Sequence, residues 1–475
     1  MSLQSFLNTH TDNTIVLVQG LGFVGSVMSL VVANAINGNY AVIGVDQDTD
    51  RGRRTVDSLN SGIFPIAADD PKMAEYFENT RCRKNFYATV DKSAYMEADI
   101  IIVDINLDVH KTSDERNALT SYDVNLSPFI SAIKTIGKYC KPNALILVET
   151  TVPPGTCRNI VAPTLKAALK ERGLPSDKMY VGHSYERVMP GPHYIDSIQN
   201  FYRVYSGIDE ASANAVETFL KTIIRTDEYP LTRLGSTNAT EMAKVLENSY
   251  RAMNIAFIVE WSRMAEEAGV DIYEVVYAIR RRPTHSNLML PGIGVGGYCL
   301  TKDPLLASWS RRNLLGGKER LMQSETAVSI NDQMPRYAFE FLEKRYPYNL
   351  KRSKVLLLGV SYRGDVGDTR FSPVEPFYRC LSSAGAQVSV HDPYVKAWTE
   401  TEIVPFTDLS DALSTECDII VISTGHRIYK QEKTIDELFL CEPLWIYDTI
   451  GFLSEKQIIR LQEKHTVIVL GRGDL

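Results

Sequence analysis

The chain carries the same order of short apolar runs twice, once toward each end. The first copy has runs at residues 15–18, 41–45, 99–103 and 144–148, separated by stretches with helical periodicity. Short, β-branched runs that alternate with helices are typical of strands buried in a parallel sheet. The pattern therefore predicts an α/β chain whose N-terminal half is a doubly wound, Rossmann-like domain.

The second copy has runs at residues 355–359, 387–390, 417–422 and 444–447. In both copies the second run leads into an aspartate, Asp46 in the first and Asp392 in the second. Repetition of one supersecondary layout indicates a repeated structural unit. We therefore expect two Rossmann-like, doubly wound domains in one chain.

The middle of the chain has a different pattern. Residues 238–268 contain neither glycine nor proline, and their apolar side chains recur with a helical period. Asn238 and Glu241 resemble a capping box, and Gly269 is a stop signal. A helix of this length spans about 45 Å. We expect a central long helix in a helical domain that joins the two others and pairs with its copy in a homodimer; the alternative is a packed helix without a subunit role.

These patterns divide the chain into three expected domains, at residues 1–230, 231–330 and 331–475. The net charge of -7 disfavours a nucleic-acid partner, although Arg280, Arg281 and Arg282 form one basic cluster. No run of about 18 apolar residues is present, so no membrane span is expected. The seven cysteines are scattered, without CxxC pairs or metal-ligand spacing. We expect a cytoplasmic protein without a disulfide framework or a metal site.

The first chemical motif is Gly20-x-Gly22-x-x-Gly25, which follows one expected strand and opens a helix. In that context the glycines allow a tight turn and close approach of a pyrophosphate to the helix N-terminus. Asp46 ends the next strand, where a carboxylate accepts hydrogen bonds from the adenosine ribose, which favours NAD over NADP. Arg51 weakens that preference, since arginine can hold a 2′-phosphate. The alternative is a tight turn without a ligand.

The second motif is a glycine-rich segment, residues 291–304, that contains Cys299 and Asp303. If a helix starts near Cys299, the thiol and the carboxylate share one face, and the helix N-terminus lowers the thiol pKa, as a nucleophile requires. A buried small hydrophobe is the alternative for a lone cysteine. Lys244 and Asn248 share one face of the central helix and could stabilise an oxyanion; alone, they would be a solvated pair.

Together, these segments resemble the UDP-glucose/GDP-mannose dehydrogenase family over nearly the whole chain. The matching motifs, in order, are Gly20-x-Gly-x-x-Gly25, Glu149-Thr-Thr151-Val-Pro153, Glu186-Arg-Val-Met-Pro-Gly191, Lys244-x-x-x-Asn248, Gly294-Val-Gly-Gly-Tyr-Cys299-x-x-x-Asp303, Gly359-Val-Ser-Tyr-Arg363 and Asp368-Thr-Arg370-x-Ser-Pro373. The closing Gly471-Arg472-Gly473 is also similar to the family.

The resemblance implies a two-step, NAD-dependent oxidation of the C6 alcohol of a UDP-sugar to the uronic acid, for surface polysaccharide precursors. It implies that Cys299 attacks the intermediate aldehyde to give a thiohemiacetal, and that oxidation then gives a thioester. Asp303 would position or activate the hydrolytic water, with Thr151 acting through a bound water. Glu186 stands where the family has a carboxylate near the hydrolytic step.

The resemblance also implies two sets of binding residues. Residues on the cofactor side are Gly20, Gly22, Phe23, Val24, Gly25, Asp46, Arg51, Glu149 and Thr151. Residues on the substrate side are Arg187, Lys244, Asn248, Arg282, Gly296, Arg363 and Arg370, with Lys244 and Asn248 holding the substrate oxygen and the oxyanion. One arginine of 280–282 would reach the substrate across the dimer, and which of the three does so stays open.

Three places in the sequence depart from the family pattern. Asn106 and Leu107 stand where the family has a Thr-Pro pair on the cofactor side, so this departure concerns the nicotinamide contacts, and the other two concern the sugar. The Glu-Arg-Val-x-Pro-Gly form of residues 186–191 resembles the branch that acts on UDP-N-acetylhexosamines, although Tyr298 replaces a histidine common there. We favour a UDP-N-acetylhexosamine, with UDP-glucose as the alternative. Two other classes are a single-hydride hydroxyacid dehydrogenase of the 6-phosphogluconate type and a non-catalytic nucleotide-sugar binding protein.

Overall fold

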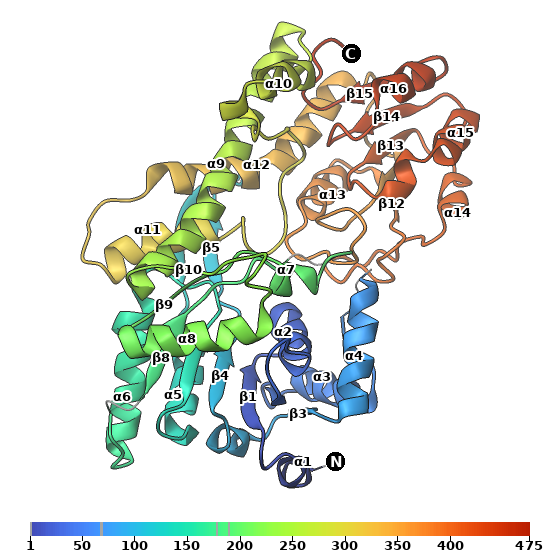
Figure 1. The fold of residues 1–475 in the computed structure, drawn as a ribbon. Helices are drawn as coiled ribbons and strands as arrows, with labels where there is room; N and C mark the ends of the chain where they lie inside the picture. The colour runs from blue at the N-terminus through green and yellow to red at the C-terminus, as the bar shows by residue number, and fades with distance from the viewer. Residues whose placement is uncertain (1, 67–69, 177–178, 189–190) are drawn as a thin grey trace. The chain divides into compact units, whose positions relative to one another are not determined.

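The computed structural model describes residues 2–66, 70–176, 179–188 and 191–475 (Figure 1). The chain forms two compact units. The N-terminal unit comprises Met1–His110, Asp123–Leu246 and Leu306–Arg320, and the C-terminal unit comprises Lys111–Tyr122, Glu247–Leu305 and Leu321–Leu475. The predicted three-domain boundaries stay a prediction, because a division into two compact units does not test them.

The N-terminal unit is built on a sheet of eight strands in the order β10-β9-β8-β7-β4-β1-β2-β3. Strand β1 pairs in parallel with both β2 and β4, so the strand order reverses direction at β1. Ligands of open α/β sheets bind at such a switch point, outside the carboxyl ends of the strands. The strands are β1 (Thr14–Gln19), β2 (Tyr40–Val45), β3 (Phe86–Thr89), β4 (Ile100–Val103), β7 (Leu145–Val148), β8 (Tyr180–His183), β9 (Val204–Gly207) and β10 (Thr232–Arg233).

Helices cover both faces of this sheet, as the side chains of β1 show. Leu17 packs into one core cluster, with Ile133 and Leu165 of the covering helices, and Val16 and Val18 pack into the other. Successive strand residues point to opposite faces, so apolar runs without alternation require cover on both sides. The helices are α1 (Leu3–Thr9), α2 (Phe23–Ala33), α3 (Asp50–Ser61), α4 (Pro71–Arg83), α5 (Ser127–Tyr139), α6 (Ala162–Glu171), α7 (Asp196–Gln199) and α8 (Glu210–Ile223).

The C-terminal unit contains a second parallel sheet, in the order β12-β11-β13-β14-β15. Leu357 of β11 belongs to one core cluster, and its neighbours Leu356 and Leu358 belong to another, so this sheet is also covered on both faces. The predicted α/β fold with two Rossmann-like domains is confirmed. The strands are β11 (Lys354–Leu358), β12 (Gln387–His391), β13 (Ile419–Ile422), β14 (Trp445–Asp448) and β15 (Thr466–Val469), and the helices are α10 (Ile272–Arg280), α12 (Met322–Arg345), α13 (Val374–Ser383), α14 (Leu409–Leu413), α15 (Glu432–Leu440) and α16 (Glu455–Gln462).

A two-stranded hairpin, β5 (Val109–Ser113) and β6 (Leu119–Val124), was not predicted. Its residues Lys111–Tyr122 belong to the C-terminal unit, although they lie early in the chain. There Lys111 Nζ binds Asp332 Oδ2 of α12 at 2.6 Å. Polar strands with many exposed side chains lack the apolar periodicity from which the other strands were predicted.

The predicted central helix is α9 (Thr237–Ala268), which is continuous, and Gly269 ends it at φ +70° as predicted. The predicted capping box is wrong. The helix starts earlier, and Ser236 accepts the Ala239 N–H at 3.3 Å, while Asn238 lies inside the helix. Glu241 is instead buried and accepts the N–H groups of Gly155 and Cys157 at 2.6 and 2.7 Å. A local spacing does not determine which backbone donors a buried carboxylate meets.

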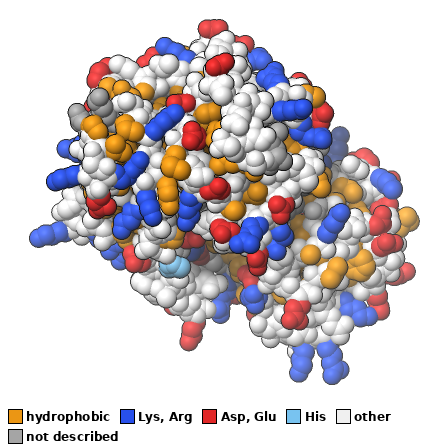
Figure 2. All heavy atoms as spheres, turned by 90° about the horizontal axis from the view of Figure 1, so that it is seen from below, with side chains coloured by type: hydrophobic (Ala, Val, Ile, Leu, Met, Phe, Trp, Pro, Cys, Tyr) orange, Lys and Arg blue, Asp and Glu red, His pale blue; other side chains and the backbone are white. Residues whose placement is uncertain are grey.

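The surface mixes charges of both signs. On the face shown in Figure 2, Lys and Arg side chains are interspersed with Asp and Glu side chains rather than separated by sign. Within the described parts of the chain, no helix has the length and apolar character needed to cross a membrane.

Candidate functional site

The glycine motif has the predicted turn geometry in the N-terminal unit. Gly20 has φ +96°, and a Cβ on Gly25 would lie 1.8 Å from the Gly20 carbonyl oxygen, so both positions require glycine. Gly22 caps α2, and a Cβ there would meet nothing within 4 Å. Phe23 and Val24 form the first turn of α2 and are half-buried. The turn thus leaves open space at the helix N-terminus, as a pyrophosphate requires.

Asp46 directly follows β2 and is half-buried. Its Oδ1 accepts the Gln47 N–H at 2.7 Å. Arg51 lies exposed in the first turn of α3. Asp46 therefore stands at the carboxyl edge of the strand next to β1, where a ribose-binding carboxylate is expected.

A buried polar cluster lies at the carboxyl ends of β4 and β7. It contains Asp104, Glu149 and Arg203, and Arg203 forms an ion pair with Glu149 in which both side chains are almost fully buried. Burial raises the pKa of Glu149 to about 7, although Arg203 opposes the shift. Burial and the Glu149 charge also raise the pKa of Asp104 well above its usual value. Burial therefore favours the protonated form of these two carboxyl groups, beside the glycine turn, whose Gly20 lies against the Asp104 carbonyl.

Sequence reasoning found Glu149 but not Asp104 or Arg203. A signal was present, because Asp104 is a charged residue directly after a continuous apolar run. Arg203 had no such local signal.

Lys244 and Glu186 are neighbours in the N-terminal unit. Lys244 is buried on α9, and its Nζ donates to the Glu186 carbonyl oxygen at 2.8 Å and lies 5.4 Å from the Tyr185 ring centroid. Arg187 lies over the same ring, at 5.0 Å. Thr151 follows β7 and is half-buried. Residues 189 and 190 of the same motif lie outside the described residues.

The cysteine loop, residues 291–302, lies in the C-terminal unit. Gly294 and Gly297 have φ values of +127° and +82°, which favour glycine. Asn331 of α12 fastens the loop, because its side chain accepts the Val295 N–H at 2.7 Å and donates to the Val295 carbonyl at 2.9 Å. Cys299 is exposed in this loop. The cysteine loop thus exposes the Cys299 thiol, and Asn331 fixes the backbone of the same loop at Val295.

The predicted helix start near Cys299 is wrong, because α11 (Asp303–Asn313) begins four residues later. Residues 298–302 form turns, yet the Asp303 N–H donates to the Cys299 carbonyl at 2.9 Å. The tight glycine turns just before Cys299 delay the regular helix. Cys299 therefore precedes the helix by about one turn rather than opening it.

Asp303 is fully buried and holds two polar partners from its own unit. Asn248 Nδ2 donates to Oδ2 at 2.7 Å, and Lys302 Nζ lies 2.7 Å from Oδ1. Lys302 also lies 4.4 Å from the Tyr298 ring centroid. The structure thus brings together the predicted Asn248 and Asp303, and it adds Lys302, which sequence reasoning missed although it is adjacent to Asp303.

The predicted arginines differ in how they are held. Arg363 is exposed after β11, whereas Arg370 binds both carboxylate oxygens of Asp368, at 2.9 and 2.7 Å. Arg280 donates to the Leu288 carbonyl at 2.6 Å, and Arg281 and Arg282 are exposed. An arginine that already binds a carboxylate is a pre-oriented cation rather than a mobile one.

A cavity of about 1320 Å³ within the C-terminal unit is lined by Val295 and Thr301 of the cysteine loop and by Arg370. Gly296 is packed tightly near it, since a Cβ there would lie 2.5 Å from the Phe371 carbonyl oxygen. This volume lies above the range of about 300–1,000 Å³ that is usual for small-ligand pockets.

A glycine turn at the switch point, an acid after the second strand and a polar loop around a thiol define a dinucleotide-dependent dehydrogenase. The models of the UDP-glucose/GDP-mannose dehydrogenase family match the NAD binding domain at residues 14–224, the central domain at 238–333 and the UDP binding domain at 356–455. The chain therefore belongs to this family. It is an oxidoreductase with NAD as its cofactor and a UDP-sugar as its substrate.

Individual relatives agree with this assignment. The chain is 28% identical to UDP-N-acetyl-D-mannosamine dehydrogenase of Methanococcus maripaludis, over 98% of this chain and 100% of the relative. It is 30% identical to the enzyme of the same name from Pyrococcus horikoshii, over 87% and 90%.

Solved structures are also similar. A UDP-D-ManNAc dehydrogenase from Pyrococcus horikoshii has a TM-score of 0.79 at 27% identity, covering 97% of this chain and 100% of that one. An NDP-N-acetyl-D-galactosaminuronic acid dehydrogenase from Methanosarcina mazei has a TM-score of 0.75 at 26% identity, covering 100% and 99%.

Proposed function

We propose that the chain oxidises the C6 alcohol of a UDP-N-acetylhexosamine to the carboxylate, in two steps, with Cys299 as a covalent nucleophile. The observation that carries the proposal is the exposed Cys299 thiol on a glycine loop, one turn before a buried Asp303 with two polar partners. The names of the relatives favour an N-acetylated sugar. UDP-glucose is the second candidate, and the product would serve surface polysaccharide synthesis in the cytoplasm.

The chain's residues supply the steps around the thiol. NAD, when bound, accepts one hydride in each oxidation, so two NAD molecules, bound in turn, take up the four electrons. The Cys299 sulfur attacks the aldehyde carbon to form a thiohemiacetal, and oxidation of that carbon gives a thioester. Water then breaks the carbon–sulfur bond, which releases the carboxylate and restores the thiol. Asp303 is assigned to the water, since its carboxylate can accept a proton.

The remaining roles follow from residue chemistry. Lys244 and Asn248 are assigned to the oxyanion and the substrate oxygen, because an ammonium and an amide both donate hydrogen bonds to developing negative charge. Thr151 and Glu186 are assigned to the hydrolytic water. Arg363 and Arg370 are assigned to the diphosphate, which guanidinium groups bind well, and Arg187, Gly296 and Arg282 to the sugar side.

A panel of UDP-N-acetylmannosamine, UDP-N-acetylglucosamine, UDP-N-acetylgalactosamine, UDP-glucose and GDP-mannose tests the substrate, with NADH counted per sugar. Two NADH per acid support the two-step reaction, and one would overturn it. Cys299→Ser should abolish acid formation and retain UDP-sugar binding, whereas Cys82→Ser, at the other exposed cysteine, should change neither. Full turnover by Cys299→Ser would remove the covalent role.

We also propose a homodimer through α9 and α10. The α9 side chains Phe257, Trp261 and Met264 are 51%, 48% and 58% exposed, and Tyr277 of α10 is 54% exposed. Phe257, Trp261 and Met264 recur at helical spacing, and an exposed apolar stripe of this kind favours association with a second copy. Analytical ultracentrifugation should find a dimer and should find a monomer for Phe257→Glu/Trp261→Glu. A monomeric wild-type protein at working concentration would reject the dimer.

A further inference from the structure

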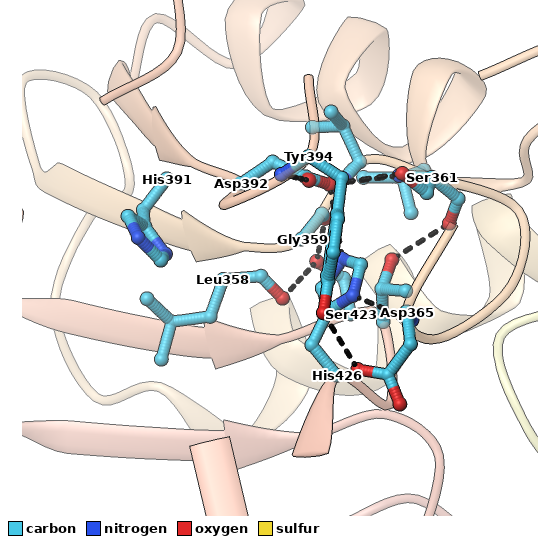
Figure 3. Close-up of polar contacts among 12 residues, drawn as sticks. Leu358, Gly359, Ser361, Asp365, His391, Asp392, Tyr394, Ser423 and His426 are labelled. Atoms are coloured by element: carbon cyan, nitrogen blue, oxygen red, sulfur yellow. Dashed lines mark hydrogen bonds and ion pairs between the residues drawn. The ribbon is translucent and has the colours of Figure 1, made fainter. Parts of the chain in front are cut away.

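The carboxyl edge of the second sheet carries a buried, hydrogen-bonded Asp–His pair that the proposed reaction does not use. Asp392 follows β12 and His426 follows β13, and both side chains are fully buried, with Asp392 Oδ2 3.1 Å from His426 Nε2. Figure 3 shows Ser361 beside Asp392, and Asp365 beside His426. A buried charge is costly unless it is paired and hydrogen-bonded, so the partners of this carboxylate define its role.

The Asp392 carboxylate binds the loop that follows β11. Its Oδ2 accepts the N–H groups of Val360 and Ser361 at 2.9 and 3.2 Å and the Ser361 hydroxyl at 3.1 Å. Its Oδ1 accepts the Tyr394 N–H at 2.9 Å. Burial acts to raise the pKa of Asp392, but the hydrogen bonds from His426 and the backbone outweigh it and lower the pKa. In a nucleotide-binding turn, backbone N–H groups of this kind face a phosphate. Here the N–H groups of Val360 and Ser361 bind the Asp392 carboxylate instead.

His426 fastens the other end of the same loop. Its Nδ1 accepts the Asp365 N–H at 2.8 Å, which assigns the ring hydrogen to Nε2, the nitrogen that faces Asp392. The Asp365 carboxylate in turn accepts a hydrogen bond from the Arg427 Nε–H group at 2.6 Å. Residues 360–365 are therefore held at both ends by side chains that follow β12 and β13.

The loop held in this way carries Tyr362 to the cysteine loop. A Cβ on Gly296 would lie 2.7 Å from the Tyr362 Cβ, and a Cβ on Gly297 would lie 2.9 Å from its ring. The Tyr362 side chain therefore packs directly against the backbone of Gly296 and Gly297. Gly297 is two residues from Cys299, so a displacement of Tyr362 moves the backbone that carries the thiol.

We infer that Asp392 and His426 are positioning residues for Cys299. They fix residues 360–365, these fix Tyr362, and Tyr362 sets the conformation of the cysteine loop. The inference rests on the proposed function only in assigning a catalytic consequence to the position of Cys299. The contacts that it invokes all lie within the C-terminal unit.

The experiment measures alkylation of Cys299 by iodoacetamide in the full-length protein, followed by mass spectrometry of the Cys299 peptide, together with kcat, KM and NAD binding. Asp392→Asn should change the alkylation rate and lower kcat, each on the order of tenfold, because small displacements of reacting groups have large kinetic effects. NAD affinity should not change, since the glycine turn belongs to the other unit. His426→Gln, which keeps a donor toward Asp392, should have a smaller effect than His426→Leu.

Two further variants decide the outcome. Asp418→Asn is the matched control, because Asp418 also accepts a main-chain N–H, that of Lys354 at 2.7 Å, but at the opposite edge of the sheet. It should leave alkylation and kcat unchanged. Tyr362→Leu leaves the Asp392–His426 hydrogen bond intact and should reproduce the effect of Asp392→Asn, so it tests the inference even if Asp392→Asn does not fold.

Wild-type alkylation rates in Tyr362→Leu, or in a folded Asp392→Asn, would overturn the inference. Alkylation does not depend on a catalytic role of Cys299. Failure of the proposed nucleophile, shown by turnover of Cys299→Ser, is therefore distinguishable from failure of this inference.

Discussion

Asn248 and Asp303 are separated by 55 residues in sequence, yet Asn248 Nδ2 donates to Asp303 Oδ2 at 2.7 Å. One residue belongs to the long helix α9 and the other begins α11. The bond orients a buried carboxylate that also meets Lys302. The amide is therefore a partner of the carboxylate as well as a candidate donor to the substrate.

Asn248→Asp replaces this donor by a second carboxylate at hydrogen-bonding distance. Two carboxylates so close share a proton, which raises the pKa of the pair, and Asp303 must be ionised to accept a proton from water. We therefore expect kcat to fall by about a hundredfold and the acidic limb of the pH–rate profile to move to higher pH. The measurement is kcat between pH 6 and pH 9. Asn254→Asp, on the same helix and bonded to the Asn287 carbonyl, is the control. An unchanged profile for Asn248→Asp would contradict the prediction.

Lys302→Met removes the cation from the buried Asp303. An uncompensated buried charge costs roughly 3–5 kcal/mol, so the free energy of unfolding should drop by about that amount. Urea denaturation measures the change. The double variant Lys302→Met/Asp303→Asn should recover part of the stability because it removes the charge as well. A double variant no more stable than Lys302→Met would argue against the ion pair as the cause.

The glycine turn predicts opposite behaviour for two substitutions. In Gly22→Ala the new Cβ meets nothing within 4 Å, so the protein should fold normally, but NAD affinity should fall by about tenfold or more if a pyrophosphate approaches that backbone. In Gly25→Ala the Cβ would meet the Gly20 carbonyl at 1.8 Å, so the fold of the turn itself should be disrupted. Calorimetric titration with NAD and thermal unfolding separate the two effects. Gly235→Ala, another open position, is the control for Gly22→Ala.

Glu241 predicts a pH dependence of stability. Burial raises its pKa to about 7, from 4.5 in the unfolded chain, although backbone donors oppose the shift. Between these values the folded protein retains a proton that the unfolded chain has lost. Stability from this group is therefore present below pH 4.5 and is lost as pH rises through 7, by up to about 1.4 kcal/mol per pH unit.

The test of this dependence compares wild type with Glu241→Gln by urea denaturation at pH 5, 6 and 7. The variant should be destabilised overall, because it loses one acceptor for a buried N–H, but it should decline less with pH. Glu149 titrates in the same range, so the difference between the two proteins is the informative quantity. Parallel pH curves would contradict the assignment.

Much of the fold could be predicted from the sequence because its signals are local. Continuous β-branched runs require burial on both faces, so the central strands of both sheets were found close to their observed limits. The hairpin β5–β6 was missed, since its strands are polar and its packing depends on residues such as Asp332, far along the chain. The cap of α9 was assigned wrongly because Glu241 binds a distant loop instead of its own helix.

In the candidate site, too, local motifs could be predicted from the sequence, whereas contacts between distant residues could not. The glycine, cysteine and lysine motifs were visible because each is a short segment with a fixed chemical purpose. Lys302, Asp104 and Arg203 were not, because their roles depend on which charged groups become buried beside them.

Asp46 and Asp392 follow equivalent strands, and they show how far the sequence predicts the environment of a residue. The sequence by itself determined that Asp46 and Asp392 each follow the second strand of a Rossmann-like repeat. Tertiary structure alone decided that Asp46 stays half-exposed, whereas Asp392 turns inward to Val360, Ser361 and His426. Local periodicity specifies the end of a strand, but the burial of a charge depends on donors that only the folded chain brings together.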